Sequence, residues 1–260
     1  MKRIHLFEIE DQSWFPSFLR NYMTDFLQFL SNKAKIYKPI VPLLTKKLKA
    51  SNQNTIVDLA SGGGGGLLWL NEAIKKELPE LKITLTDYYP NISAFKHTQK
   101  SANNFQFVTE SIDARNVPKH LTGFRTQFLS FHHFKPTNAK QILQNAIDDQ
   151  SPIAIFEAQD RSVYSIIGML LSPLTLLFVT PFIKPFKIGR IIFTYFIPII
   201  PICVLWDGLV SCLRTYSVQE MNSMVKSLQN FKGFNWEIGK KTEKNAKVLY
   251  LIGLPKNKEN

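Results

Sequence analysis

TIVDLASGGGGG, residues 55–66, is the stretch that decides the fold. The apolar run from Thr55 to Leu59 predicts a short buried strand, and five consecutive glycines follow it closely. The next segment, residues 67–78, has apolar positions at helical spacing and is stopped by Pro79. A strand, a glycine turn and a helix in this order indicate a parallel sheet whose first turn lets a ligand approach the backbone.

Strands and helices continue to alternate as far as residue 157. The expected strands are 83–86, 105–109, 125–131 and 152–157, and the expected helices between them are 91–102 and 138–148. Helices are expected over 13–49, and a helix at 217–230 with strands at 234–239 and 246–255 is expected to end the chain. This alternation predicts an α/β fold with a mostly parallel sheet and helices on both faces.

The length of 260 residues favours one domain with insertions. We expect four parts: an N-terminal helical cap (1–52), a cofactor-binding part (53–160), an apolar helical insertion or lid (161–216), and a C-terminal helix with the last two strands (217–260). Cys203 and Cys212 lack the spacing of a disulfide framework or a zinc site, and the N-terminus lacks the apolar run of a signal peptide. A cytoplasmic location is therefore expected.

The formal net charge of +12 could steer the protein towards nucleic acid or an anionic membrane surface. Its lysines are spread along the chain and are not interleaved with arginine and aromatic residues, which favours an ordinary solvated basic surface.

Three carboxylates accompany three successive expected strands: Asp58, Asp87 and Asp113. Asp87 stands where a carboxylate would accept hydrogen bonds from both ribose hydroxyls of an adenosine ligand, as it also would in a hydride-transfer dinucleotide enzyme. Asp113 could accept from an adenine amino group, with Ile112 against the ring. Each aspartate alone could be a helix cap or turn residue, but the set of three is more specific.

VDLASGGG, TLTDYYPN, ESIDA and FLSFHHF resemble, in order, the motifs of the class I, Rossmann-like methyltransferases, over roughly residues 55–157. The chain also resembles uncharacterised bacterial members that carry an apolar insertion after the fifth strand. The resemblance implies a seven-stranded sheet with an antiparallel last strand, and S-adenosylmethionine as the cofactor. The implied cofactor-binding residues are Asp58, Ala60, Ser61, Gly62, Gly63, Gly64, Asp87, Tyr88, Ile112, Asp113, Ala114 and Phe131. Ala60 departs from the family pattern, which has glycine at this position.

Methyl transfer chiefly requires alignment of donor and acceptor, with removal of a proton where necessary. His132 and His133 end the fourth expected strand, where class I enzymes place residues that face the methyl group, so one imidazole could act as a base. Adjacent residues on a strand point in opposite directions, so at most one should face the site. A pair of structural histidines is the alternative. A metal site would need further histidine or carboxylate ligands, which the sequence does not locate.

Asp207 is a third candidate catalytic residue. It lies seven residues before Arg214 in WDGLVSCLR, and the two side chains could pair on one helical face. They could equally anchor the insertion to the sheet domain. Trp14 and Arg20 of the N-terminal cap are expected to help close the acceptor pocket.

The insertion contains two apolar segments, 166–183 and 188–206, each near the ~20 residues that cross a bilayer. Full crossing is disfavoured because prolines interrupt the segments, and because Lys184, Lys187 and Arg190 would lie on the translocated side. We expect a re-entrant or interfacial hairpin whose basic residues meet lipid phosphates, or else a lid or an oligomer interface.

Together these features predict an S-adenosylmethionine-dependent methyltransferase that acts on a small apolar or amphiphilic acceptor, lipid- or quinone-like. We expect it in the cytoplasm, peripheral or re-entrant at the inner face of the cell membrane. An RNA or protein methyltransferase is one alternative, although the sequence does not match the motifs of amino-methylating or cytosine-methylating nucleic-acid enzymes. A non-catalytic S-adenosylmethionine-binding protein or membrane-associated scaffold is another.

Overall fold

The computed structural model describes residues 1–243 and 246–256. Its strands are β1 (Thr55–Asp58), β2 (Lys82–Leu85), β3 (Phe105–Phe107), β4 (Phe124–Phe128), β5 (Ile153–Glu157), β6 (Phe234–Glu243) and β7 (Ala246–Pro255). They form one seven-stranded sheet in the order β3-β2-β1-β4-β5-β7-β6. The first five strands pair in parallel, and β7 runs antiparallel between β5 and β6. The predicted fold class is confirmed.

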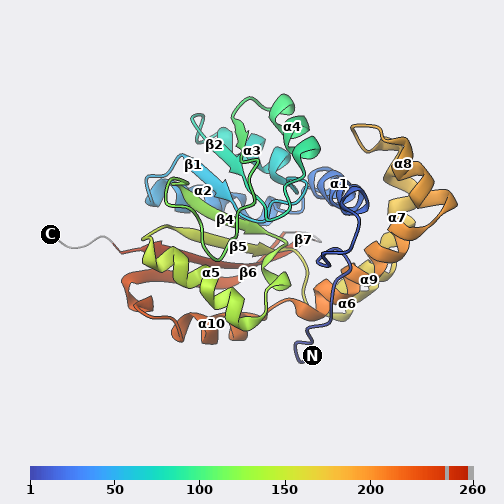
Figure 1. The fold of residues 1–260 in the computed structure, drawn as a ribbon. Helices are drawn as coiled ribbons and strands as arrows, with labels where there is room; N and C mark the ends of the chain where they lie inside the picture. Colours follow the sequence, from blue (N-terminus) through green and yellow to red (C-terminus); the bar gives the residue numbers. More distant parts are fainter. Residues whose placement is uncertain (244–245, 257–260) are drawn as a thin grey trace.

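Helices lie on both faces of the sheet and beside it (Figure 1). They are α1 (Ser17–Ala34), α2 (Val41–Ala50), α3 (Leu67–Lys75), α4 (Ile92–Ser101), α5 (Pro136–Asp148), α6 (Val163–Leu170), α7 (Ser172–Val179), α8 (Ile188–Ile191), α9 (Ile199–Arg214) and α10 (Val218–Lys226). Outside the insertion, most of these bounds differ from the expected ones by only a few residues.

The sheet has a hydrophobic core on each face because successive residues of a strand point to opposite sides. In β1, Ile56 belongs to the same core as Leu44 of α2 and Leu70 of α3, whereas Val57 belongs to the core that includes Ile142 of α5. The helix α2, expected to belong to an N-terminal cap, is therefore part of a main sheet core.

Helix α1 holds the glycine turn in place. The Asn32 side chain donates to the carbonyl of Gly65 at 2.7 Å and accepts from the backbone N–H of Trp69 at 2.8 Å. A Cβ at Gly63 would lie 2.8 Å from the carbonyl oxygen of Thr24. Glycine is required there because the turn packs directly against the backbone of α1.

The apolar insertion forms an arm, residues 163–214, that lies beside α1 and away from the sheet (Figure 1). Leu19 and Phe26 of α1 share a buried cluster with Leu176, Ile200 and Val204 of the arm. Within the described residues, no single helix is long and apolar enough to span a membrane. Two bent pairs of helices, 163–182 and 188–214, reach that length and composition together, with bends of 42° and 79°.

Two of the three basic residues at the turn of the arm bind the protein itself. Asp25 of α1 accepts from Arg190 at 2.7 Å and from Lys187 at 2.8 Å. Arg190 is 1% exposed and also donates to the carbonyls of Ile183 and Pro185. The expectation that all three basic residues meet lipid phosphates is wrong for Arg190, because its charge is buried against Asp25.

We predict that Gly63→Ala destabilises the fold by roughly 1–3 kcal/mol, because its Cβ would press on the Thr24 carbonyl. Gly168→Ala is the matched control, since a Cβ there meets nothing within 4 Å. Urea unfolding of both variants measures the difference. Equal stabilities would contradict the close packing of α1 on the turn.

Candidate functional site

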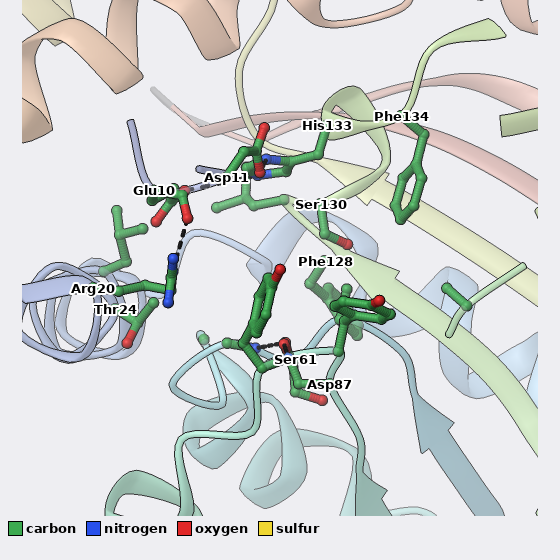
Figure 2. Close-up of a pocket in the computed structure, with 18 of the residues that line it drawn as sticks. Glu10, Asp11, Arg20, Thr24, Ser61, Asp87, Phe128, Ser130, His133 and Phe134 are labelled. Carbon is green, nitrogen blue, oxygen red and sulfur yellow. Dashed lines mark hydrogen bonds and ion pairs between the residues drawn. The ribbon is translucent and has the colours of Figure 1, made fainter. Parts of the chain in front are cut away.

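A cavity of about 700 Å³ opens beyond the carboxyl ends of the parallel strands (Figure 2). Nine of the residues expected to bind a cofactor line it: Ala60, Ser61, Gly62, Gly63, Asp87, Tyr88, Ile112, Asp113 and Ala114. They come from the segments after β1, β2 and β3, so the sheet brings the three expected motifs to one site. Asp58, Gly64 and Phe131 do not line the cavity.

Asp58 supports the glycine turn from beneath. Its carboxylate accepts from the hydroxyl of Thr126 at 2.7 Å, and its backbone carbonyl accepts from the hydroxyls of Thr86 and Ser61 at 2.8 and 3.0 Å. Burial raises the pKa of this carboxyl to about 7. Asp58 does not line the cavity itself, but it positions Ser61, which does.

Asp87 connects the first two turns. One carboxylate oxygen accepts from the backbone N–H of Gly62 and the other from that of Tyr89, both at 2.7 Å. Burial raises its pKa, and the two backbone N–H groups act against that rise. A carboxylate has about four lone-pair positions, so two remain for a ligand in the cavity. Two adjacent hydroxyl groups of a ligand could donate to these two positions.

Asp113 is held by the fork of Arg115, with contacts of 2.6 to 3.0 Å to its two oxygens. These hydrogen bonds lower its pKa, so the group is an oriented carboxylate at neutral pH. The neighbouring Ile112 donates its backbone N–H to the carbonyl of Asp87 at 2.9 Å. The second and third motifs are therefore fixed relative to each other.

The segment after β4 differs from the expectation. The strand ends at Phe128, and Phe131–His133 form a 3₁₀ turn in which the two histidine rings lie 4.4 Å apart. The histidines therefore do not point to opposite sides of a strand, although only one of the two, His133, lines the cavity, as expected. Phe131 is fully buried against Tyr216, and Phe128, Leu129 and Ser130 line the cavity in its place.

The two histidines have different surroundings. His132 is buried and does not line the cavity; its Nδ1 lies 2.9 Å from Glu157, which also accepts its backbone N–H. His133 lines the cavity, and its Nδ1 lies 2.7 Å from Glu8 and 2.9 Å from Asp11. Burial alone would lower the pKa of His133, but the two carboxylates raise it well above its ordinary value. In this arrangement His133 holds a proton at neutral pH and is not a free base.

Asp207 and Arg214 do not pair with each other, and of the two alternatives the anchoring role is the nearer one. Arg214 binds Asp11 at 2.8 Å and donates to the carbonyl of His133. The Asp207 carboxylate accepts from the backbone N–H groups of Ile9 at 2.6 Å and Glu10 at 3.0 Å. Asp207 does not line the cavity, so it serves as an anchor for the N-terminal segment and lies outside the candidate catalytic groups.

The N-terminal segment, residues 1–16, forms one wall of the cavity; the sequence predicted that the N-terminal cap helps to close the pocket, but through other residues than most of those found. Its lining residues are His5, Leu6, Phe7, Glu10, Asp11 and Gln12. Arg20 lines the cavity as expected and donates to the carbonyl of Glu10 at 2.7 Å, whereas Trp14 does not line it. Figure 2 shows Asp11 beside His133. The three acids in FEIED were the available signal, but nothing in sequence spacing places them beside this histidine.

No protein-family model matches the chain, and no curated protein matches its sequence. Among solved structures, it is similar to the plantazolicin methyltransferase BpumL in complex with SAH, with a TM-score of 0.53 and 16% identity over 92% of this chain and 88% of that one. PigF with SAH gives a TM-score of 0.52 and 16% identity, over 94% of this chain and 63% of that one.

The methyltransferase domain of bacterial CtHen1-CN gives a TM-score of 0.51 and 11% identity, over 84% of this chain and 99% of that one. The chain therefore has the Rossmann-like fold of the class I methyltransferases, as its motifs predicted.

We predict that Asp207→Asn loosens the N-terminal segment, because an amide has one oxygen to receive two backbone N–H groups. The local cost should be about 1–3 kcal/mol. Hydrogen exchange of residues 1–12 measures it, with the exposed Glu80→Gln as the control. Unchanged exchange in Asp207→Asn would contradict the anchoring role.

Proposed function

We propose that this protein is an S-adenosylmethionine-dependent methyltransferase. The observation that carries this proposal is that the glycine turn, Asp87 and Asp113 all face one cavity at the carboxyl edge of the sheet. Asp87 has free acceptor positions for ribose hydroxyls, and Asp113 with Ile112 is suited to an adenine ring. The SAH held by two of the similar structures agrees with this ligand.

The acceptor would bind between the cofactor motifs and the N-terminal segment. Apolar side chains line the cavity there: Leu6, Phe7, Leu27 and Phe134. Polar side chains line it as well, among them Glu10, Asp11, His133, Lys135 and Asn138. An acceptor with an apolar body and one polar group that receives the methyl group fits this lining.

The chemistry would rest on alignment. Methyl transfer is an in-line displacement in which the acceptor atom attacks the methyl carbon and the donor sulfur leaves with its bonding electrons. Glu10 lines the cavity, and burial raises its pKa to about 8, so its ionised form could take a proton from the acceptor.

The arm supplies the reason to expect a lipid-soluble acceptor. It carries large apolar side chains that face solvent, including Tyr164 at 88%, Phe178 at 77% and Phe196 at 78% exposure. Residues 162–183 contain no charged side chain. Monomeric proteins rarely leave a large contiguous apolar patch uncovered, and such patches mark interaction sites.

We infer that the arm lies in the surface of an anionic bilayer, with the rest of the protein peripheral on the cytoplasmic side. The net charge of +12, although spread along the chain, attracts the protein as a whole to an anionic surface. Both helix pairs of the arm are sharply bent, which suits insertion along the interface better than crossing. An acceptor dissolved in the membrane would then be presented close to the cavity.

The cofactor is tested by calorimetric titration with S-adenosylmethionine and with its demethylated product. We expect both to bind, and Asp87→Asn to weaken binding of the product at least about tenfold because a charged acceptor is lost. Asp148→Asn, on the exposed side of α5, should bind as the native protein does. No binding of either ligand by the native protein would refute the proposal.

The membrane surface is tested by co-sedimentation with vesicles of phosphatidylcholine and phosphatidylglycerol. We expect the native protein to bind and the double variant Phe178→Glu/Phe196→Glu to lose at least about tenfold in binding, because both side chains are exposed on the arm. Gln141→Glu, exposed on α5, controls for added negative charge. Equal sedimentation of the double variant and the control would reject the arm as the contact.

A further inference from the structure

Glu8, His132 and His133 form a compact group of potential metal ligands beside the cavity. One ligand atom from each lies within 4.8 Å of the others. Glu8 and His132 are buried, with exposures of 0% and 2%. Ligand atoms that share one ion at bond lengths near 2.1 Å lie roughly 3–4 Å apart, so a small contraction would bring these atoms onto one ion.

The hydrogen bonds of His132 direct a lone pair towards Glu8. Its Nδ1 lies 2.9 Å from the Glu157 carboxylate, which can only accept, so we assign the ring proton of the neutral form to Nδ1. The Nε2 atom is then an acceptor, and it lies 3.9 Å from Oε1 of Glu8. Two donors also approach these atoms: the Ser211 hydroxyl donates to Oε1 at 3.0 Å, and the Gln159 amide nitrogen lies 3.5 Å from Nε2. The second lone pair of Oε1 and the long contact to Nε2 leave both atoms available to a cation between them. A carboxylate behind a ligating histidine is also the usual support of a metal site.

Glu8 provides a second, independent observation. Its Oε2 atom is buried and is held by charged neighbours and not by a well-aligned hydrogen bond among the described residues. The Nδ1 of His133 at 2.7 Å and the guanidinium of Arg214 at 3.1 Å approach this oxygen without hydrogen-bond geometry. This buried oxygen is compensated by cationic neighbours, and a metal ion that replaced the His133 proton would keep it compensated.

We propose that Glu8, His132 and His133 bind one divalent transition-metal ion, with Asp11 as a further oxygen ligand. Asp11 reaches the same His133 Nδ1 at 2.9 Å and lines the cavity. On metal binding, His133 would release its Nδ1 proton to solvent and give the lone pair to the ion.

The ligand set indicates which ions suit the site. Two imidazole nitrogens with one or two carboxylates favour Zn²⁺, Mn²⁺ or Fe²⁺ over Mg²⁺ or Ca²⁺, which prefer oxygen ligands alone. The local charge is also appropriate: the carboxylates of Glu8, Asp11 and Glu157 contact the two imidazoles, and the guanidinium of Arg214 contacts Glu8 and Asp11.

The position of the site gives it a use that rests on the proposed function. His133 and Asp11 line the cavity that holds the cofactor motifs, at the side formed by the N-terminal segment. An ion at this side could bind the polar group of the acceptor and lower the pKa of an acceptor hydroxyl before the methyl group is transferred. The binding of metal by the four residues does not depend on that use.

Metal binding is tested on the untagged full-length protein, stripped with a chelator and then dialysed against Zn²⁺ or Mn²⁺. Mass spectrometry of the metal content should give about one ion per chain for at least one of the two ions. Glu8→Gln and His133→Gln should each weaken binding by about tenfold or more. Glu72→Gln and His120→Gln, both exposed and remote in sequence from the site, should bind as the native protein does.

Thermal unfolding with and without the metal provides a second readout. The ion should raise the melting temperature of the native protein and the controls, and raise it less in Glu8→Gln and His133→Gln. Asp11→Asn, at a partly exposed position, serves if either of those variants does not fold. No ion bound by the native protein, or equal binding by the site variants and controls, would overturn the proposal. The experiment contains no methyl donor, so its result is separate from that of the cofactor titration.

Discussion

The contact of Glu8 and Asp11 with His133 and Arg214 is the interaction on which the cavity depends. It joins three parts of the chain that are distant in sequence: the N-terminal segment, the turn after β4 and the end of α9. Without it the cofactor motifs would still lie at the edge of the sheet, because strand order places them there. The wall opposite them would be missing.

The parts of the fold that could be predicted from sequence are those fixed by local patterns. Alternating strands and helices, the glycine turn, and the aspartates after β2 and β3 depend on residues near each other in the chain or on strand order, and the structure places them as expected. Strand length was harder, because FLSFHHF is as apolar as a strand. Leu129 adopts a positive φ of 51° directly after Phe128, where β4 ends, and this moves Phe131 into the core.

The candidate site could be predicted only in part because its remaining contacts are long-range. Asp207 and Arg214 suggested a pair from helical spacing, but they bind the N-terminal segment instead, at the backbone of Ile9 and the side chain of Asp11, which lie 198 and 203 residues away. A charged residue inside an apolar segment is expected to need an ion-pair partner, but the sequence does not indicate which residue that partner is. The same is true of Asp25 and Arg190.

Helix α9 connects the N-terminal segment to the arm. It carries Asp207, which binds that segment, and also part of the exposed apolar surface of the arm. Trp206 donates its indole N–H to the carbonyl of Phe7 at 3.0 Å, and Phe7 lines the cavity. Suppose that a bilayer binds α9 more tightly when this segment is docked than when it is undocked. Thermodynamic reciprocity then requires that membrane binding stabilise the docked segment by the same free energy. Binding to the lipid surface and closure of the cavity would then be thermodynamically coupled.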